Sequence, residues 1–583
     1  MTAVDQLRGS FQYPQIESDF PPSAPQEMER AVEILQDHKD AWVAVAPRSR
    51  VALIEELIRD YSTIVPRLVE AEVTAKDLRD SDFGIGQEFL NQSVVLRYLR
   101  GLRHAIEDIQ TFGHPRIPGP VSTRSGGQVV ARIFPDTGYD RLLFGGYSME
   151  VWMEPGVMLA DLGRTQARAY ADKNHSGRVA LVLGAGNISA LAVTDVLYKL
   201  FVEDQVVLLK LNPVNAYTGP LIAEGLRALV QAGFVRLAYG GPAEGSYLCR
   251  HPGVDAVHMT GSDKTFDAIV FGSGAEGAER KASSRPLLTK PVTAELGCVT
   301  PVIVVPGSWT SGEIHYQAEK LASWLANNTG FTCGTPHMLL LHAQWPQRRQ
   351  FLDALRHQLS EVPLRRAYYP GAPQIRARFV AAHPEAEEFG RPAAGEMPWT
   401  LIPSVPANGR DEICFNQEAF CGLLAETPIE AADAAEFLDR ATAFANQRLW
   451  GTLGATLFVQ PASLKQAGLA AAVDRAIANL RYGVVSVNVA VVGVYFLAMA
   501  PWGSFPGQEI ANVQSGLGWV HNSLMFSRPQ KVVLRAPFME SPPSPFLASR
   551  ARVGRKLAPR LVALEAAPSP WKIPGLLWAA MGG

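Results

Sequence analysis

Two side chains in the middle of the sequence could carry out nucleophilic chemistry. Cys333 lies in the run Asn327 to Gly334, and Glu295 precedes it along the chain. A thiolate can attack an electrophilic carbonyl, and a carboxylate can activate water to hydrolyse the resulting thioester. A single cysteine is more often a small buried residue than a nucleophile, so the pair needs support from other parts of the sequence.

Further motifs give that support through their order along the chain. They are Gly184-Ala-Gly-Asn187, Val207-Leu-Leu-Lys210, His258-Met-Thr-Gly-Ser262, Gln417-Glu418-Ala-Phe420 and Ala500-Pro-Trp-Gly503. With these motifs, the chain resembles the aldehyde dehydrogenase superfamily from about residue 150 to about residue 525. Phe331 and Phe266 stand where Gln and Gly are common in that family, which indicates a divergent member.

The resemblance implies a role for each candidate residue. Cys333 would be the nucleophile, Glu295 the general base, and Asn187 a donor to the oxyanion. The cofactor would be NAD or NADP, bound by Lys210, Ser262, Glu418 and Phe420. Family members that prefer NAD often carry a Glu three residues after the lysine. Pro213 stands there in this chain, so the group that would repel a 2′-phosphate is missing and NADP becomes a candidate.

The leading functional interpretation is NAD(P)-dependent oxidation of an apolar aldehyde to its carboxylic acid. The apolar substrate is inferred from side chains that the resemblance puts at the pocket mouth, namely Phe331, Phe420, Tyr495, Phe496 and Leu497. Two alternatives remain open. One is a CoA-acylating aldehyde dehydrogenase or acyl-thioester reductase, in which a thiol replaces water. The other is a catalytically weak scaffold or membrane-associated relative.

Composition narrows the class of protein. The chain has 583 residues, with 54 Lys and Arg against 56 Asp and Glu, and this near-neutral balance argues against a nucleic-acid partner. Its odd number of cysteines, five, implies no disulfide framework. Cys249, Cys414 and Cys421 have no His or Cys at metal-ligand spacing, so no metal site is expected. The N-terminus lacks the apolar core of a secretory signal, which predicts a cytoplasmic protein.

Short apolar runs alternate with helical patterns along most of the chain. This alternation predicts an α/β fold, which the resemblance resolves into two doubly wound parallel-sheet domains, a Rossmann-like cofactor domain and a catalytic domain, with a β-hairpin oligomerisation arm. The expected divisions are a helical part of the cofactor domain (20–125), the oligomerisation hairpin (126–153), the NAD(P)-binding domain (154–297), the catalytic domain (298–510), an oligomerisation strand (511–541) and a C-terminal tail (542–583).

The hairpin is expected to consist of Val129–Phe134 and Leu142–Phe144, joined by Lys531–Leu534. By the resemblance, this arm would join subunits into a homodimer or homotetramer.

Two segments raise the question of a membrane. Residues 482–508 carry no charge, but their alternation and their Gly and Pro residues predict buried strand and loop. In the tail, basic residues precede Trp571 and Trp578, a pattern of peripheral membrane contact. The prolines of the tail argue against a long amphipathic helix and favour a tail that docks on the protein.

Overall fold

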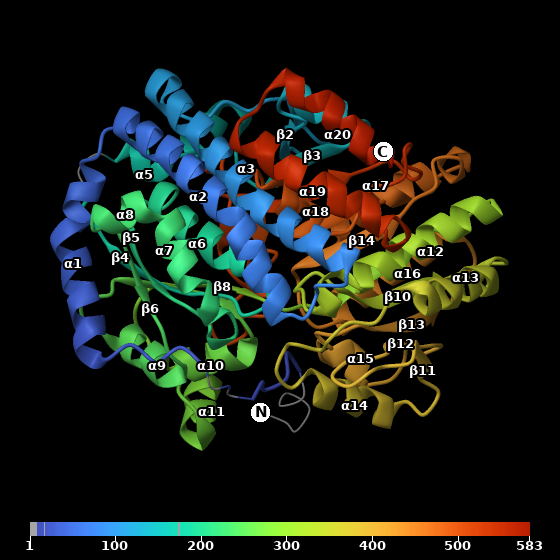
Figure 1. The fold of residues 1–583 in the computed structure, drawn as a ribbon. Helices are drawn as coiled ribbons and strands as arrows, with labels where there is room; N and C mark the ends of the chain where they lie inside the picture. Colours follow the sequence, from blue (N-terminus) through green and yellow to red (C-terminus); the bar gives the residue numbers. More distant parts are fainter. Residues whose placement is uncertain (1–7, 15, 17, 173–174, 583) are drawn as a thin grey trace.

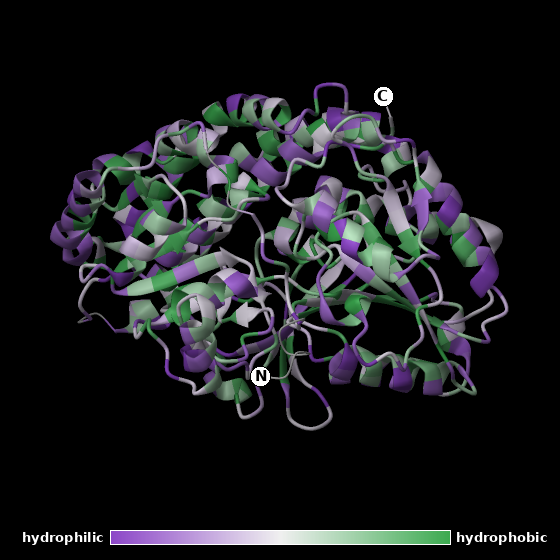
Figure 2. Cartoon of the chain, turned by 90° about the horizontal axis from the view of Figure 1, so that it is seen from below, coloured by the Kyte–Doolittle hydropathy of each residue, from purple (hydrophilic) through white to green (hydrophobic). Residues whose placement is uncertain are grey.

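Two β-sheets form the centre of the molecule, with helices packed around them (Figure 1). The structure is a computed structural model, and it describes residues 8–14, 16, 18–172 and 175–582. Both sheets are largely parallel, which confirms the predicted α/β fold with two parallel sheets. Figure 2 shows hydrophobic strands inside and hydrophilic residues on the outer helices.

The first sheet has six strands within the described residues, in the order β17-β8-β7-β4-β5-β6. Its strands are β4 (Val179–Leu183), β5 (Val206–Lys210), β6 (Val235–Ala238), β7 (Ala256–Gly261), β8 (Val292–Leu296) and the antiparallel β17 (Gly516–Leu517). The chain runs from β4 to β6 on one side and returns to β7 on the other side of β4. In such sheets a ligand binds where the strand order reverses, beyond the carboxyl ends of the strands.

Helices cover this first sheet. They are α6 (Ser189–Phe201), α7 (Gly219–Gly225), α8 (Arg227–Gln231), α9 (Pro242–Arg250), α10 (Asp263–Val270) and α11 (Gly274–Ala282). Two helices precede this sheet in the chain, α1 (Pro25–Val43) and α2 (Pro47–Ala75), and Pro47 is the first residue of the second. The helix α3 (Asp82–Phe112) packs on α2 and α6.

The second sheet has eleven strands in the same part of the chain, in the order β1-β2-β3-β19-β15-β14-β9-β10-β13-β12-β11. The strands are β1 (Val121–Thr123), β2 (Val129–Phe134), β3 (Ser148–Met153), β9 (Thr300–Val304), β10 (Pro336–His342), β11 (Glu387–Phe389), β12 (Trp399–Ile402), β13 (Leu423–Ile429), β14 (Gly454–Phe458), β15 (Val484–Val487) and β19 (Pro529–Arg535). Its main helices are α12 (Ser311–Leu325), α13 (Arg348–Glu361), α14 (Ala372–Ala382), α15 (Ile413–Asn416), α16 (Ala434–Arg448), α17 (Leu469–Asn479) and α18 (Gly493–Leu497).

The hairpin has a different second strand from the predicted one. Residues 142–144 were expected to be a strand, but the helix α4 (Gly138–Leu143) ends there and the second strand is β3. Thr137 caps α4, since its side chain accepts from the backbone N–H of Asp140 at 3.1 Å, and Arg97 donates to Asp140 at 2.7 Å. The expected pairing of the late strand is confirmed, because β19 runs antiparallel to β3.

The C-terminal tail forms two helices, α19 (Ala551–Ala566) and α20 (Ile573–Ala580). The later prolines of the tail interrupt the helical path, as expected, because α19 ends before Pro568, and Pro570 and Pro574 lie at the starts of η7 (Pro570–Lys572) and α20. Pro559 lies inside α19. The helix α19 packs along α3, as a docked tail would. Among the described residues, no helix combines the length and apolar character that crossing a membrane requires.

Candidate active site

A cavity of about 430 Å³ lies at the carboxyl ends of the first sheet and reaches the second. All seven candidate residues line it, namely Asn187, Lys210, Ser262, Glu295, Cys333, Glu418 and Phe420. The cavity therefore contains a thiol, two carboxylates, an amide and an ammonium group within one enclosed space.

Cys333 and Glu295 form a direct pair in this cavity. Glu295 is the last residue but one of β8, and its carboxylate is hydrogen-bonded to the thiol of Cys333, which follows the short turn η4 (Asn327–Gly330). Trp502 donates its indole N–H to Oε1 of Glu295 at 3.1 Å. Burial raises the pKa of Glu295 to about 7, although both hydrogen bonds act to lower it.

The thiol of Cys333 is held neutral in this state of the site. Surrounding protein desolvates it, although part of the residue faces the cavity, and the neighbouring Glu295 carboxylate disfavours a second negative charge. Both effects raise the pKa of the thiol well above its ordinary value. A positive charge beside Cys333 would be needed to favour the thiolate.

Asn187 points its amide at the segment that carries the nucleophile. Its Nδ2 donates to the carbonyl oxygen of Phe331 at 2.9 Å. The alternative that Asn187 merely caps a helix does not hold, since α6 begins at Ser189 without any side-chain cap. The backbone carbonyl of Asn187 accepts from Tyr368 Oη at 2.7 Å and from Asn328 Nδ2 at 3.2 Å, so two further side chains fix this loop.

One end of the cavity suits the phosphates of a dinucleotide. Lys210 ends β5, burial lowers its pKa to about 8, and no ion pair joins it to a carboxylate in the described part of the chain. Ser262 caps α10 by accepting from the backbone N–H of Thr265 at 3.1 Å. A buried cation beside a helix N-terminus is a favourable place for an anion. These residues fit NAD or NADP.

Glu418 lies between the two ends of the cavity. Its Oε1 accepts from the backbone N–H of Cys298 at 3.2 Å, and its Oε2 accepts from Ser10 Oγ at 3.0 Å. Burial raises the pKa of Glu418 to about 8. Gly297 permits this approach, because a Cβ there would lie 1.9 Å from Oε2 of Glu418.

The expected pocket mouth is only partly found. Phe420 lines the cavity, but Phe331 is fully buried and its ring packs against Tyr368 with centroids 5.1 Å apart. Tyr495 is also buried, with its ring 4.7 Å from that of His521. Phe331 and Tyr495 therefore support the site from behind instead of forming its entrance.

One cluster of potential metal ligands was not visible in the sequence. The thiol of Cys414 lies 3.6 Å from Nε2 of His383, although 31 residues separate them. Glu412 and Glu385 each accept from one nitrogen of the His383 ring, both at 2.9 Å. Burial would lower the pKa of His383, but these bonds outweigh it and raise the pKa. With a carboxylate oxygen 2.9 Å from each ring nitrogen, this geometry suits a protonated His383 that donates to both carboxylates.

Comparison with known proteins agrees with this geometry. Residues 176–374 match the model of the aldehyde dehydrogenase family. N-Succinylglutamate 5-semialdehyde dehydrogenase of Novosphingobium aromaticivorans is 28% identical over 194 residues, which cover 30% of this chain and 38% of that enzyme. The likeness to the aldehyde dehydrogenase family thus covers residues 176–374, and the chain spans 38% of the length of this curated relative.

Solved structures of this superfamily share the fold over most of their length. The NADP-dependent glyceraldehyde-3-phosphate dehydrogenase of Bacillus halodurans C-125, solved with NADP, has a TM-score of 0.56 at 17% identity and covers 88% of this chain and 92% of its own. A mutant of aldehyde dehydrogenase C of Pseudomonas syringae, solved with NAD⁺ and octanal, has a TM-score of 0.58 at 16% identity and covers 88% and 89%. At these identities the likeness concerns the fold.

Sequence reasoning missed several side chains around this site. Trp502 belongs to a quoted motif, but nothing in the motif indicates a bond to Glu295. Asn328 precedes the nucleophile closely, and the structure gives it a left-handed backbone, with φ of 47°, which asparagine tolerates better than most residues. Tyr368 and Ser10 come from distant segments that carry no motif.

Proposed function

We propose that this protein oxidises an aldehyde to its carboxylic acid with NAD or NADP as the oxidant. The observation that carries the proposal is the hydrogen-bonded pair of Cys333 and Glu295, in a cavity that also contains Lys210, which forms no ion pair within the described residues. A thiol next to a buried carboxylate whose pKa is about 7 suits attack on a carbonyl followed by hydrolysis.

In the proposed reaction the sulfur of Cys333 bonds to the aldehyde carbon as the thiol gives up its proton to solvent. The carbonyl oxygen becomes an oxyanion, to which the backbone N–H of Cys333 and the amide of Asn187 would donate. The amide of Asn187 has two N–H groups and only one is bonded to Phe331. A nicotinamide cofactor, which Lys210, Ser262 and Glu418 would hold, would supply the acceptor for the hydride that the substrate carbon loses as the acyl thioester forms on Cys333.

Glu295 acts in the second half of the proposed reaction. In its deprotonated form it takes a proton from water, whose oxygen attacks the thioester carbon. The carbon–sulfur bond then breaks, the acid leaves, and the thiol of Cys333 recovers a proton. The hydrogen bond from Trp502 holds Oε1 of Glu295 in place for this step.

The adenosine end of the cavity favours NADP among the two cofactors. Pro213 lines the wall near Lys210, so no carboxylate stands at this position to repel a 2′-phosphate. The guanidinium of Arg250 lines the same wall and forms no ion pair in the described part of the chain. The rings of Phe420 and Tyr369, which line the cavity near Cys333, support an apolar aldehyde.

The test follows reduction of NAD and of NADP by absorbance, with a panel of aldehydes from acetaldehyde to long-chain and aromatic ones. Cys333→Ala should abolish turnover, while Cys249→Ala, at a buried core thiol, should not. Turnover without CoA would support the proposal. Turnover only with CoA would indicate the thioester-forming alternative, and no turnover with either would indicate a scaffold. Preference for small hydrophilic aldehydes would contradict the apolar substrate.

We also propose the partners that the sequence suggested. The hairpin arm ends in the edge strand β1, whose Ser122 and Thr123 are exposed, and such an edge could join two subunits. Light scattering should then give the mass of a homodimer or homotetramer.

Peripheral membrane contact through Trp571 and Trp578, which are 89% and 64% exposed, is tested by sedimentation with vesicles with and without residues 542–583.

A further inference from the structure

We infer that the N-terminal segment Gly9–Pro14 forms a wall of the dinucleotide site, in which Ser10 positions Glu418 and the hydroxyl of Tyr13 bonds to the nicotinamide half of the cofactor. This inference rests on the proposed function. The segment lies far outside the motifs on which that function was argued. Four of its residues, Ser10, Gln12, Tyr13 and Pro14, line the cavity.

Backbone hydrogen bonds fix the start of the segment to two parts of the molecule, the chain around Asn416–Glu418 and the helix α10. The N–H of Gly9 donates to the carbonyl of Asn416 at 2.8 Å, and the N–H of Glu418 donates to the carbonyl of Gly9 at 3.2 Å. The N–H of Ser10 donates to Asp263 Oδ1, in α10, at 2.8 Å. Gly9 has φ of 109°, and a Cβ there would lie 2.1 Å from Asp263 Oδ2. The contact therefore requires glycine.

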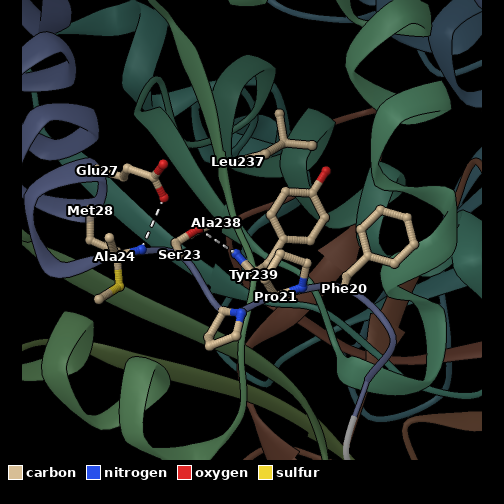
Figure 3. Close-up of a pocket in the computed structure, with 10 residues that line it drawn as sticks. Phe20, Pro21, Ser23, Ala24, Glu27, Met28, Leu237, Ala238 and Tyr239 are labelled. Atoms are coloured by element: carbon tan, nitrogen blue, oxygen red, sulfur yellow. Dashed lines mark hydrogen bonds between the residues drawn. The ribbon is translucent and has the colours of Figure 1, made fainter.

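Aromatic packing holds the chain on both sides of the cavity. Phe11 is buried, and its ring lies 5.7 Å from that of Phe379 in α14. Further along, Phe20 stacks on Tyr239, and Ser23 exchanges two hydrogen bonds with Tyr239 at 3.1 and 3.2 Å (Figure 3). Phe11 thus anchors the segment on α14, and Phe20 and Ser23 anchor the chain beyond the segment on Tyr239, which follows β6.

Ser10 acts on the carboxylate proposed for the nicotinamide ribose. Its hydroxyl donates to Oε2 of Glu418 at 3.0 Å, while Cys298 N–H holds Oε1. The two donors together fix the plane of the carboxylate. Loss of the hydroxyl would leave Oε2 of a buried carboxylate without this donor, so the side chain would lose its orientation. Ser10 is a positioning residue.

Tyr13 presents an unsatisfied donor at the same place. Its ring packs against those of Phe420 and Tyr369, with centroids 5.8 and 5.4 Å apart. Its hydroxyl oxygen is buried and has no hydrogen-bond partner among the described residues. A buried hydroxyl without a partner is costly, and a ligand that bonds to it removes that cost. The amide and ribose oxygens of a nicotinamide nucleotide have the required chemistry.

The experiment measures dissociation constants of NADH and NADPH by their fluorescence. We expect Tyr13→Phe and Ser10→Ala each to weaken binding by about fivefold to tenfold. Ser10→Thr, which keeps the hydroxyl, should restore most of the affinity. Tyr316→Phe, in α12 and outside the cavity lining, is the matched control and should bind as the unaltered protein does. Thermal unfolding of each variant checks that it is folded.

The possible outcomes separate this inference from the proposed function. If the unaltered protein binds a dinucleotide and Tyr13→Phe and Ser10→Ala bind it equally well, the wall has no role and the inference fails alone. Tighter binding by these variants would mean that the segment obstructs the site, which also overturns the inference. If the unaltered protein binds neither NADH nor NADPH, the proposed function fails and the inference fails with it.

Discussion

At the scale of single residues, the pKa of Glu295 determines how the proposed reaction depends on pH. Burial raises that pKa to about 7, and only the deprotonated carboxylate can take a proton from water. Steady-state acid formation should therefore rise as pH increases through about 7. Below it, the acyl thioester should accumulate, and a burst of reduced cofactor should precede a slow steady rate.

Glu295→Gln tests this role directly. A general base commonly contributes about a hundredfold or more to a rate, so the steady rate should fall by at least about that factor. One burst of reduced cofactor per active site should remain, because hydride transfer precedes hydrolysis. Rapid mixing with absorbance detection measures both phases. An unchanged steady rate would show that Glu295 is not the base.

The indole of Trp502 should set the exact position of this pH profile. Its N–H donates to Oε1 of Glu295 and so favours the charged carboxylate. Trp502→Phe removes the donor, which should raise the pKa of Glu295 above about 7 and move the rate profile to higher pH. Trp345→Phe is the matched control, because Trp345 donates to the distant carbonyl of Gly307 at 2.8 Å. A profile that moves equally in both variants, or in neither, contradicts this coupling.

At the scale of elements, two loops from different sheets meet at the nucleophile, and Tyr368 ties them together. Its hydroxyl donates to the carbonyl of Asn187 at 2.7 Å and lies 3.0 Å from Oδ1 of Asn328. Tyr368→Phe should lower kcat by about tenfold while the cofactor KM stays constant, since the change displaces the proposed oxyanion donor.

The control for this change is Tyr482→Phe, which removes one buried hydrogen bond, to the carbonyl of Ala445 at 3.0 Å, far from these loops. Steady-state kinetics of the two variants with a common aldehyde separates a local effect from general loosening. If Tyr482→Phe reduces kcat as strongly, the role of Tyr368 in the loops is refuted.

The elements themselves were largely predictable because local apolar runs and turn residues determine them. The apolar run at Val129–Phe134 predicted β2, and Lys531–Leu534 predicted the strand β19 that pairs with the hairpin. Residues 142–144 were misread because their Leu-Leu-Phe run resembles a strand. The cap at Thr137 and the ion pair of Asp140 with the distant Arg97 make this segment a helix. Contacts between residues so far apart in the sequence leave no pattern in the local sequence from which they could be predicted.

At the scale of the molecule, residues 8–14 and the C-terminal helices both pack on the fold, and neither segment carries one of the motifs named above. Motif order was enough to bring all seven candidate residues to one cavity, because parallel strands put their carboxyl ends at one edge. Nothing in the composition of residues 8–14 indicated that they cross this cavity. The segment is held by backbone hydrogen bonds at Gly9 and by single side chains, and both depend on tertiary position.

The docked tail should contribute measurably to stability through Glu565 of α19. Its carboxylate accepts from Arg97 at 3.0 Å and from Arg100, and all three side chains are largely buried. Arg97 also pairs with Asp140 at 2.7 Å, so the tail is joined through α3 to the hairpin region.

Glu565→Gln leaves guanidinium groups without their partner charge, and it should lower the unfolding temperature by roughly 3 °C or more. Glu55→Gln is the control, because the exposed pair of Glu55 and Arg103, 3.5 Å apart, should contribute almost nothing. Differential scanning calorimetry compares them, and equal unfolding temperatures for both variants would mean that the tail rests on α3 without stabilising it.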